Sequence, residues 1–429
     1  MTSQKSFKKF LVVWFGQFIS LIGIGITAFS LGVYAFERTQ SATSVALVTL
    51  FTFLPSILLR PIGGLLADRM DRRLLMIIGD IGAAAGLVFI LIMLEARELE
   101  LWHIYVGVTI SSIFSALHSP AYKASATDLL SEEQYSKGSG LVQLAESSKF
   151  LFAPVIAGVL LSVTTIETIL LINIATFLIA IIAVFVIKKS IAVDRSNQVK
   201  EHWLNELLEG WYTIKRNKGV LLLVTIISIT TFYIGLLETL IGPMLLSFTD
   251  VQSLGIFQSI SAIGMLISSI VIGMVTITKR YVSMLIIGLI IGGIAFSLIG
   301  LSTNIIFIMI AGFVFLAALP FVNTSADVLV RQNIPNEKQG RVWGMIGILS
   351  QLGFIAAYCS AGYLADYLFN PWLVEDGALA STVGTVIGTG PGRGIGLIFI
   401  IAGIFVVTIG VITSKLQTIR ELDCVKISN

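Results

Sequence analysis

Charged residues are scarce in this chain. Only 12% of its 429 residues are Asp, Glu, Lys or Arg, whereas 56% are apolar, and the mean hydropathy is +0.94. A soluble globular domain carries about 25% charged residues. The shortage of charge therefore argues against a water-soluble domain and predicts a protein that lies within a lipid bilayer.

Patterns that carry enzyme chemistry are absent as well. The two cysteines, Cys359 and Cys424, show no metal-ligand spacing, and no Ser/His/Asp constellation occurs. No G-x-x-x-x-G-K-[ST] sequence is present, which argues against an ATP-driven pump. The segment GTGPGRGIG (388–396) follows no strand, so we expect a flexible linker there rather than a nucleotide site. We expect no enzyme activity, cofactor, metal or nucleic-acid partner.

Long apolar segments fill most of the chain. A membrane-spanning helix needs about 20 mostly apolar residues, and such segments recur from end to end. The first follows Lys5, Lys8 and Lys9 but lacks a signal-peptide cleavage site, so we expect it to be retained. The runs are continuous rather than alternating, which predicts an all-α integral membrane protein. Twelve transmembrane helices are expected, with cores at 10–35, 43–66, 74–94, 101–127, 139–163, 168–187, 219–246, 252–277, 281–300, 304–330, 341–367 and 394–415.

Lysine and arginine are distributed unevenly among the loops. With a cytoplasmic N-terminus, the cytoplasmic segments hold 23 of the 28 basic residues, Lys123 counted among them, and the outer loops hold only Arg38, Arg97 and Arg393. The positive-inside rule then predicts a multi-pass membrane protein with both termini in the cytoplasm. Arg60 and Lys149 are the remaining basic residues, and Arg60 is expected to snorkel to the interface.

Two stretches of the first half of the chain have counterparts in the second. GLLADRMDRRLLMIIG (64–79) aligns without gaps on GMVTITKRYVSMLIIG (273–288), and LSEEQYSKG (130–138) corresponds to IPNEKQG (334–340). This predicts two pseudo-symmetric six-helix halves, 1–187 and 219–429. The segment 188–218 between them contains Trp203, Leu207, Trp211 and Ile214 at helical spacing, which predicts an amphipathic helix in the cytoplasmic interface.

With two six-helix halves, a cytoplasmic linker and the motif G-x-L-A-D-R-x-x-R-R, the whole chain resembles the major facilitator superfamily. WFGQFISLIG (14–23), HSPAYKASATDLL (118–130) and FAPVIAGVLL (152–161) resemble its macrolide-efflux-like branch of proton-coupled drug exporters. The chain departs from the family at Asp71, where glycine is usual, and in the fourth helix, which lacks the arginine of several exporter branches. Only Pro154 and Gly158 match the antiporter pattern G-P-x-x-G-G.

The resemblance implies alternating access by two rocking halves around a central site. We expect a monomeric secondary exporter that uses inward proton flow to expel hydrophobic or amphipathic compounds. An alternative is export or flipping of an endogenous molecule, such as a siderophore or a lysophospholipid. A transporter-like sensor without flux is a third class.

The charged turn after the second helix predicts a gate. Asp68 is expected to approach the N-terminus of the eleventh helix, near Arg341, because helix N-termini attract carboxylates. Arg72 or Arg73 is expected to pair with Asp128, and the gate would favour the outward-open state. The alternative is that the arginines act only as a topogenic signal. The predicted gating residues are Gly64, Asp68, Arg69, Arg72, Arg73 and Asp128.

Carboxylates inside spans are candidates for proton coupling because charge is costly there. Glu146 and Lys149 lie three residues apart and can pair, either as a permanent structural ion pair or as an exchanging proton site. Glu238 has no basic residue within a helical turn, so it is a proton carrier, a site for a cationic substrate, or a solvated group of the outer vestibule. The predicted coupling residues are Glu146, Lys149 and Glu238.

Polar residues within the spans predict the walls of the substrate cavity. The sixth and twelfth segments contain few of them, which suits peripheral helices. His118 can titrate near neutrality, or it serves a structural role beside Pro120. The predicted cavity residues are Gln17, Ser115, His118, Gln143, Tyr233, Gln258, Asn323, Asp327, Gln351 and Tyr358.

Overall fold

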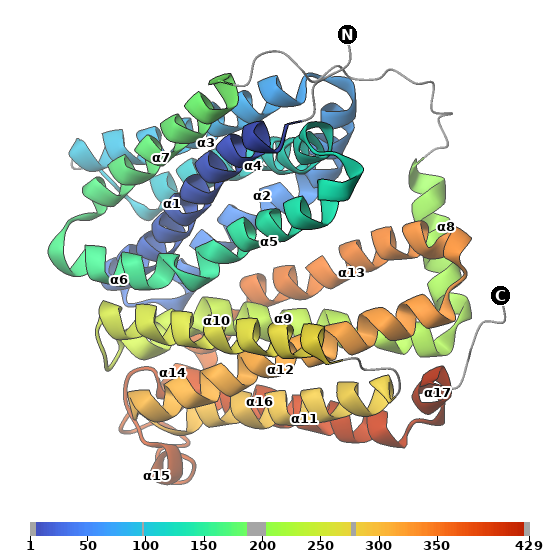
Figure 1. The fold of residues 1–429 in the computed structure, drawn as a ribbon. Coiled ribbons are helices and arrows are strands. Elements are labelled where there is room, and N and C mark those ends of the chain that lie inside the picture. Colours follow the sequence, from blue (N-terminus) through green and yellow to red (C-terminus); the bar gives the residue numbers. More distant parts are fainter. Residues whose placement is uncertain (1–5, 97, 187–202, 276–279, 424–429) are drawn as a thin grey trace. The chain divides into compact units, whose positions relative to one another are not determined.

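The structure is a computed structural model that describes residues 6–96, 98–186, 203–275 and 280–423. These residues are overwhelmingly helical, and the described ranges contain no strand (Figure 1). Contacts divide the chain into two units, Met1–Asn197 and Gln198–Asn429. Part of the predicted linker 188–218 (188–202), part of the repeat 273–288 (276–279) and Cys424 lie outside the described residues, whereas Cys359 is a free, exposed cysteine.

The described residues of the first unit form seven α-helices and one short 3₁₀ turn. Their bounds are α1 Phe7–Thr39, α2 Ala42–Arg69, α3 Arg72–Glu95, α4 Leu101–Leu129, η1 Glu132–Gln134, α5 Tyr135–Leu151, α6 Ala153–Val163 and α7 Ile166–Val186.

The second unit contains long helices of similar length and several short pieces. Their bounds are α8 Trp203–Arg216, α9 Lys218–Leu246, α10 Val251–Met274, α11 Tyr281–Leu301, α12 Ile305–Asn333, α13 Asn336–Tyr363, η2 Leu364–Phe369, α14 Asn370–Trp372, α15 Gly384–Ile387, α16 Arg393–Lys415, α17 Gln417–Arg420 and η3 Glu421–Asp423.

Twelve helical segments of the described chain are long and apolar enough to cross a membrane, which confirms the predicted fold class. The predicted cores match them closely, with two differences. The fifth span breaks between Leu151 and Ala153, just before Pro154, whose ring cannot continue the hydrogen-bond ladder of the preceding turn. The eleventh span begins at Asn336 and continues beyond Tyr363 as a π-helical turn.

Short polar residues set the starts of several helices. Asp71 accepts a hydrogen bond from the backbone N–H of Arg73 and begins α3, and Asp250 accepts one from Ser253 at the start of α10. Asn304 caps two backbone N–H groups of α12. Each cap satisfies donors that the first turn of a helix leaves without partners, so the polar turns between the apolar runs fix the helix boundaries.

Most pairings of spans recur in the two units, but α1 also packs extensively on α7, whereas α9 makes only a small contact with α16. In the first unit α2 and α3 both pack on α4, α3 also packs on α7, and α1 packs on α5 and α6. In the second unit α10 and α11 pack on α12, α11 packs on α16, and α9 packs on α13. The second and third spans of each unit therefore pack on the fourth, the third on the sixth, and the first on the fifth.

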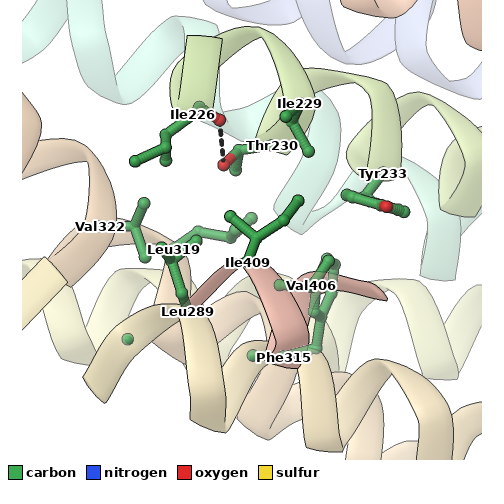
Figure 2. Close-up of a pocket in the computed structure, with 12 residues that line it drawn as sticks. Ile226, Ile229, Thr230, Tyr233, Leu289, Phe315, Leu319, Val322, Val406 and Ile409 are labelled. Carbon is green, nitrogen blue, oxygen red and sulfur yellow. Dashed lines mark hydrogen bonds between the residues drawn. The ribbon is translucent and has the colours of Figure 1, made fainter. Parts of the chain in front are cut away.

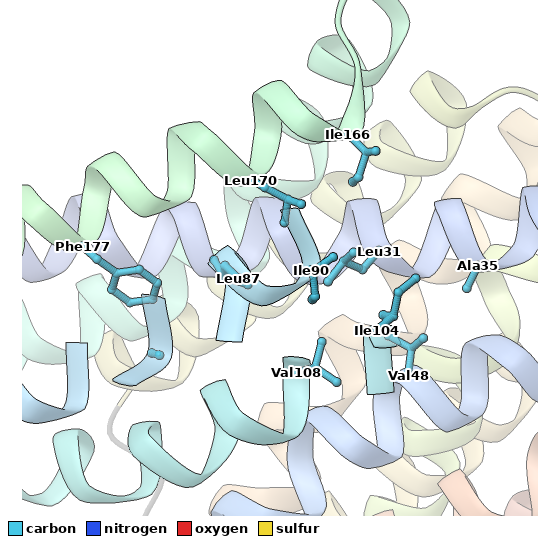
Figure 3. Packing of buried hydrophobic residues seen from close by; sticks show 11 residues of the cluster. Leu31, Ala35, Val48, Leu87, Ile90, Ile104, Val108, Ile166, Leu170 and Phe177 are labelled. Atoms are coloured by element: carbon cyan, nitrogen blue, oxygen red, sulfur yellow. The ribbon is translucent and has the colours of Figure 1, made fainter. Parts of the chain in front are cut away.

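The interior of the first unit is a set of interlocking aliphatic side chains. Figure 3 shows Leu31 of α1, Leu87 and Ile90 of α3, Ile104 of α4 and Leu170 of α7 meeting in one buried cluster. Dispersion contacts and small residues hold helices together inside a membrane, where water supplies no hydrophobic drive between them. This packing makes the unit a stable support for its few charged side chains.

The helix α8 lies where the sequence predicts an amphipathic helix, and it packs on α13 within the second unit. Ile214 is fully buried, whereas Leu208 and Tyr212 are exposed, and Glu209 forms an ion pair with Arg341. The side chains of Trp203 and Leu207 are outside the described set. A position of α8 in the membrane interface stays a prediction.

The glycine-rich segment 388–396, expected to be a linker, forms a turn over 388–392 that leads into the first turn of α16. Gly388, Gly390 and Gly392 all have positive φ, which glycine adopts without steric cost. The turn delivers Arg393 to the start of α16, where its side chain is buried and its Nη2 donates to the carbonyl oxygen of Gly300 at 2.8 Å. Arg393 thereby satisfies a carbonyl at the C-terminal end of α11.

Replacing Arg393 by methionine is expected to destabilise the protein by about 2–3 kcal/mol, because a charged hydrogen bond is lost and a buried carbonyl group is left unpaired. Thermal unfolding in detergent, followed by circular dichroism, measures the change. Arg38→Met is the matched control, since Arg38 is an exposed arginine of the first unit. Equal melting temperatures for the two variants would contradict the role of Arg393.

Candidate functional site: charged and polar groups within the spans

Arg72 links the ends of α2, α3 and α4. Its Nη1 donates to Asp128 Oδ2 at 2.7 Å and to the Ala124 carbonyl at 3.1 Å, and its Nε donates to the Ala67 carbonyl at 3.1 Å. Asp68 lies farther away, at 3.9 Å from Nη2, and is largely exposed. Since Arg72 and Asp128 both belong to the first unit, this ion pair orders the turn within that unit.

Arg73 has different partners. Its Nη2 donates to the carbonyl of Phe185 at 2.7 Å, and its guanidinium lies 5.2 Å from the centre of the Phe185 ring. A cation at the end of α7 is favourable because the helix C-terminus carries partial negative charge. Of the two arginines predicted as partners of Asp128, Arg72 therefore forms the ion pair. Arg73, also on α3, contacts the C-terminal end of α7 instead.

The remaining gating residues lie at the surface of the first unit. Arg69 is exposed in the last turn of α2. Gly64 has no atom within 4 Å of where a Cβ would stand, whereas at Gly63 a Cβ would overlap the carbonyl of Ala116. The close approach of α2 to α4 therefore depends on Gly63, which the sequence reasoning did not select.

Glu146 lies between two lysines. Lys149 Nζ is 3.5 Å from Glu146 Oε2, and Lys123 Nζ is 4.0 Å from Oε1. The Glu146 side chain is 26% exposed, so the carboxylate is neither fully buried nor fully solvated. Lys123 was counted with the cytoplasmic segments although the predicted span 101–127 contains it, and the structure places it on α4, which continues to Leu129.

A second polar group lies inside the first unit. Asp80 of α3 is 3% exposed, and its Oδ1 is 3.5 Å from Nε2 of His118 on α4. The carboxamide of Gln17, from α1, interacts with the same carboxylate. His118 stacks on Tyr122 with ring centres 6.2 Å apart. Gln17 and His118 are among the predicted cavity residues, whereas Asp80 is in none of the predicted sets of site residues.

In the second unit the structure brings together two predicted residues that are 120 positions apart. Tyr358 of α13 donates a hydrogen bond of 2.7 Å from its hydroxyl to Glu238 Oε2 on α9. Tyr358 is almost fully buried, and its ring lies 5.9 Å from that of Phe354. Glu238 is half-buried, so a carboxylate supported by a phenol donor stands within the span region of this unit.

Tyr233 lies within the packed interior of the second unit. It lines a cavity of about 20 Å³ together with apolar residues of α9, α11, α12 and α16, among them Leu289, Phe315 and Val406 (Figure 2). Its ring meets Phe296 edge to face at 5.9 Å. A cavity of this size holds about one water molecule, so Tyr233 contributes to packing there.

The other predicted cavity residues differ in exposure, and their common cavity stays a prediction. Gln17 is buried on α1, and Ser115 is half-buried on α4. Gln258 and Gln351 are half-buried on α10 and α13. Three are exposed, namely Gln143, Asn323 and Asp327.

Twelve candidate spans in two units, with carboxylates and bases held inside them, define a multi-pass membrane protein of the transporter class. The chain belongs to the Major Facilitator Superfamily, whose family model matches residues 13–358. Members of this superfamily are transporters rather than enzymes.

Known proteins similar to this chain include efflux proteins. Macrolide efflux protein A of Streptococcus pyogenes is 27% identical over 387 residues, covering 88% of this chain and 95% of the relative. Macrolide efflux protein A of Enterococcus faecalis is 30% identical over 238 residues, covering 55% and 73%. The crystal structure of the nucleoside transporter NupG is similar in fold, with a TM-score of 0.76 at 15% identity, over 95% of this chain and all of that one.

Proposed function

We propose that the chain is a proton-coupled exporter of hydrophobic or amphipathic compounds, acting as a monomer in a bacterial plasma membrane with both termini in the cytoplasm. The observation that carries the proposal is Glu146, a partly exposed carboxylate held between Lys123 and Lys149. The similarity to macrolide efflux proteins supports export as the direction of transport.

The geometry around Glu146 suits a group that exchanges its proton during a cycle. An ionised Glu146 offsets the charges of two neighbouring lysines, whereas a protonated Glu146 leaves these like charges without an anion between α4 and α5. The two protonation states thus favour different spacings of the helices. Differential stabilisation of two arrangements is what alternating access requires.

Export is tested in proteoliposomes that enclose a pH-sensitive dye and are energised by an imposed proton gradient. The probes are a macrolide, a lipophilic cation, a lysophospholipid and a siderophore. We expect the macrolide or the lipophilic cation to cause proton movement that empty liposomes lack. A response to the lysophospholipid or siderophore alone would replace drug export by export of an endogenous molecule, and no response to any probe would favour a sensor.

We propose that Glu238 and Tyr358 form the part of the site that attracts positively charged substrates. Glu238→Gln removes the negative charge but keeps the shape, so export of the lipophilic cation is expected to fall at least tenfold more than export of an uncharged amphipathic probe. Tyr358→Phe removes only the hydroxyl donor and is expected to have a smaller effect in the same direction. Equal losses for the cationic and the neutral probe would contradict this assignment.

A further inference from the structure

The polar cluster inside the first unit has a composition unlike its surroundings. It consists of Gln17 from α1, Asp80 from α3, and His118 and Tyr122 from α4, and it is separate from the Glu146 carboxylate. Asp80 is 3% exposed and Gln17 is 2% exposed. Polar side chains so deeply buried are costly within a membrane span, and they occur there mainly where they serve a function.

The backbone is shaped to bring Asp80 and His118 together. A Cβ at Gly79, next to Asp80, would lie 2.6 Å from the Cβ of His118, closer than such atoms approach, and 3.2 Å from its Cα. Glycine at this position therefore lets α3 and α4 pack closely. The 3.5 Å separation between Asp80 Oδ1 and His118 Nε2 follows from this contact.

Four polar atoms of the cluster lack a hydrogen-bond partner among the described residues. They are Gln17 Nε2, Asp80 Oδ2, His118 Nε2 and Tyr122 Oη. A buried polar atom left without a partner costs about 1–3 kcal/mol. The cluster therefore has unused hydrogen-bonding capacity that a proton on Asp80 or His118 can redistribute.

Few charged side chains lie on the helices packed around Asp80, and those of α4 besides His118, namely Lys123 and Asp128, pair with Glu146 and Arg72. The single charged residue of α7 is Glu167, in the first turn of that helix. The helix α1 carries no charge between Lys9 and Glu37. The charged residues of α2, Arg60, Asp68 and Arg69, are exposed. His118 and the neutral Gln17 are the groups that interact with the Asp80 carboxylate, while Tyr122 in turn interacts electrostatically with Glu146 on α5.

The donors in the cluster favour a proton over a metal ion. Gln17 and Tyr122 both contribute N–H or O–H groups, and one carboxylate with one imidazole is too few ligands for a metal site. Groups of three or more His, Cys, Asp or Glu suited to a metal are absent from the described residues.

We propose that Asp80 and His118 form a second proton-binding site, distinct from Glu146, that holds one exchangeable proton between α3 and α4. With one proton the pair is neutral overall, as carboxylate and imidazolium or as carboxylic acid and imidazole. Loss of that proton leaves a buried negative charge, and gain of another leaves a buried positive charge. Tyr122 stacks on His118 and interacts electrostatically with Glu146, so it links the two sites.

The claim that the site binds a proton does not depend on the proposed export function. A role of the site in transport does rest on that function. The test therefore uses no substrate. Infrared difference spectra of the full chain in lipid nanodiscs are recorded as the pH is lowered from 9 to 4, and the C=O band of buried carboxylic acid is followed. In the wild type this band is expected to grow, and in Asp80→Asn its Asp80 component is expected to be missing.

His118→Gln provides an independent measurement that retains the Asp80 carboxylate. Loss of the imidazole partner is expected to move the midpoint of the Asp80 band, because His118 interacts directly with this carboxylate. His103→Gln is the matched control, because His103 is also buried but lies at the other end of α4, and it should leave the band unchanged. Identical spectra for the wild type and Asp80→Asn, or an unmoved midpoint in His118→Gln, would overturn the proposal.

Discussion

Glu146→Gln is expected to abolish export driven by a proton gradient while the protein stays folded and still binds its substrate. The amide preserves the size of the side chain but cannot exchange a proton, so Lys123 and Lys149 face an uncharged group throughout the cycle. Uphill export into energised everted vesicles measures the loss. Substrate binding to the purified variant, measured in detergent, separates lost coupling from lost folding.

The lysine partners provide the controls for this result. Lys149→Ala leaves Lys123 near the carboxylate, and Lys123→Ala leaves Lys149, so each variant is expected to retain part of the activity with a changed pH optimum. Glu37→Gln changes an exposed carboxylate of the same unit and should export normally. Normal uphill export by Glu146→Gln would refute the proposed coupling and leave Glu146 as part of a permanent ion pair.

Asp68→Asn is expected to lower the ratio of outward-open to inward-open molecules by roughly five- to thirty-fold, the equivalent of about 1–2 kcal/mol. The reason is the predicted approach of Asp68 to the N-terminus of α13 in the state with a closed cytoplasmic side. Export turnover should fall, and a cysteine introduced near Tyr135, at the start of α5, should react faster with a thiol reagent applied from the cytoplasm.

Thermal stability distinguishes the predicted gating role of Asp68 from the structural role of Arg72. Asp68 is 76% exposed and should contribute little to folding, so Asp68→Asn should melt like the wild type. Arg72→Met breaks the pair with Asp128 and the bonds to two carbonyls, and it should cost about 2 kcal/mol. If Asp68→Asn changed neither turnover nor accessibility, the turn would be a topogenic signal and the gating proposal would fail.

The class of fold followed from features that act locally along the chain. An apolar run of about 20 residues must form a helix in a bilayer, because the backbone can satisfy its hydrogen bonds there only internally. The apolar runs end at polar residues such as Asp71 and Asn304, which cap α3 and α12 in the structure, and most boundaries were therefore predicted within a few residues from the runs alone. The signature of the charged turn and the repeat of the two halves likewise need no tertiary information.

The partners of the charged groups were decided by tertiary packing. The spacing of Glu146 and Lys149 on one helix is visible in the sequence, whereas Lys123 reaches the same carboxylate from another helix. Asp80 meets His118 because Gly79 lets α3 and α4 approach, and Tyr358 meets Glu238 across 120 residues. The sequence by itself determined which segments are helices and which carry charge, because these properties depend on neighbours in the chain. Only the tertiary structure decided which charges meet, because that depends on the rotation and separation of packed helices.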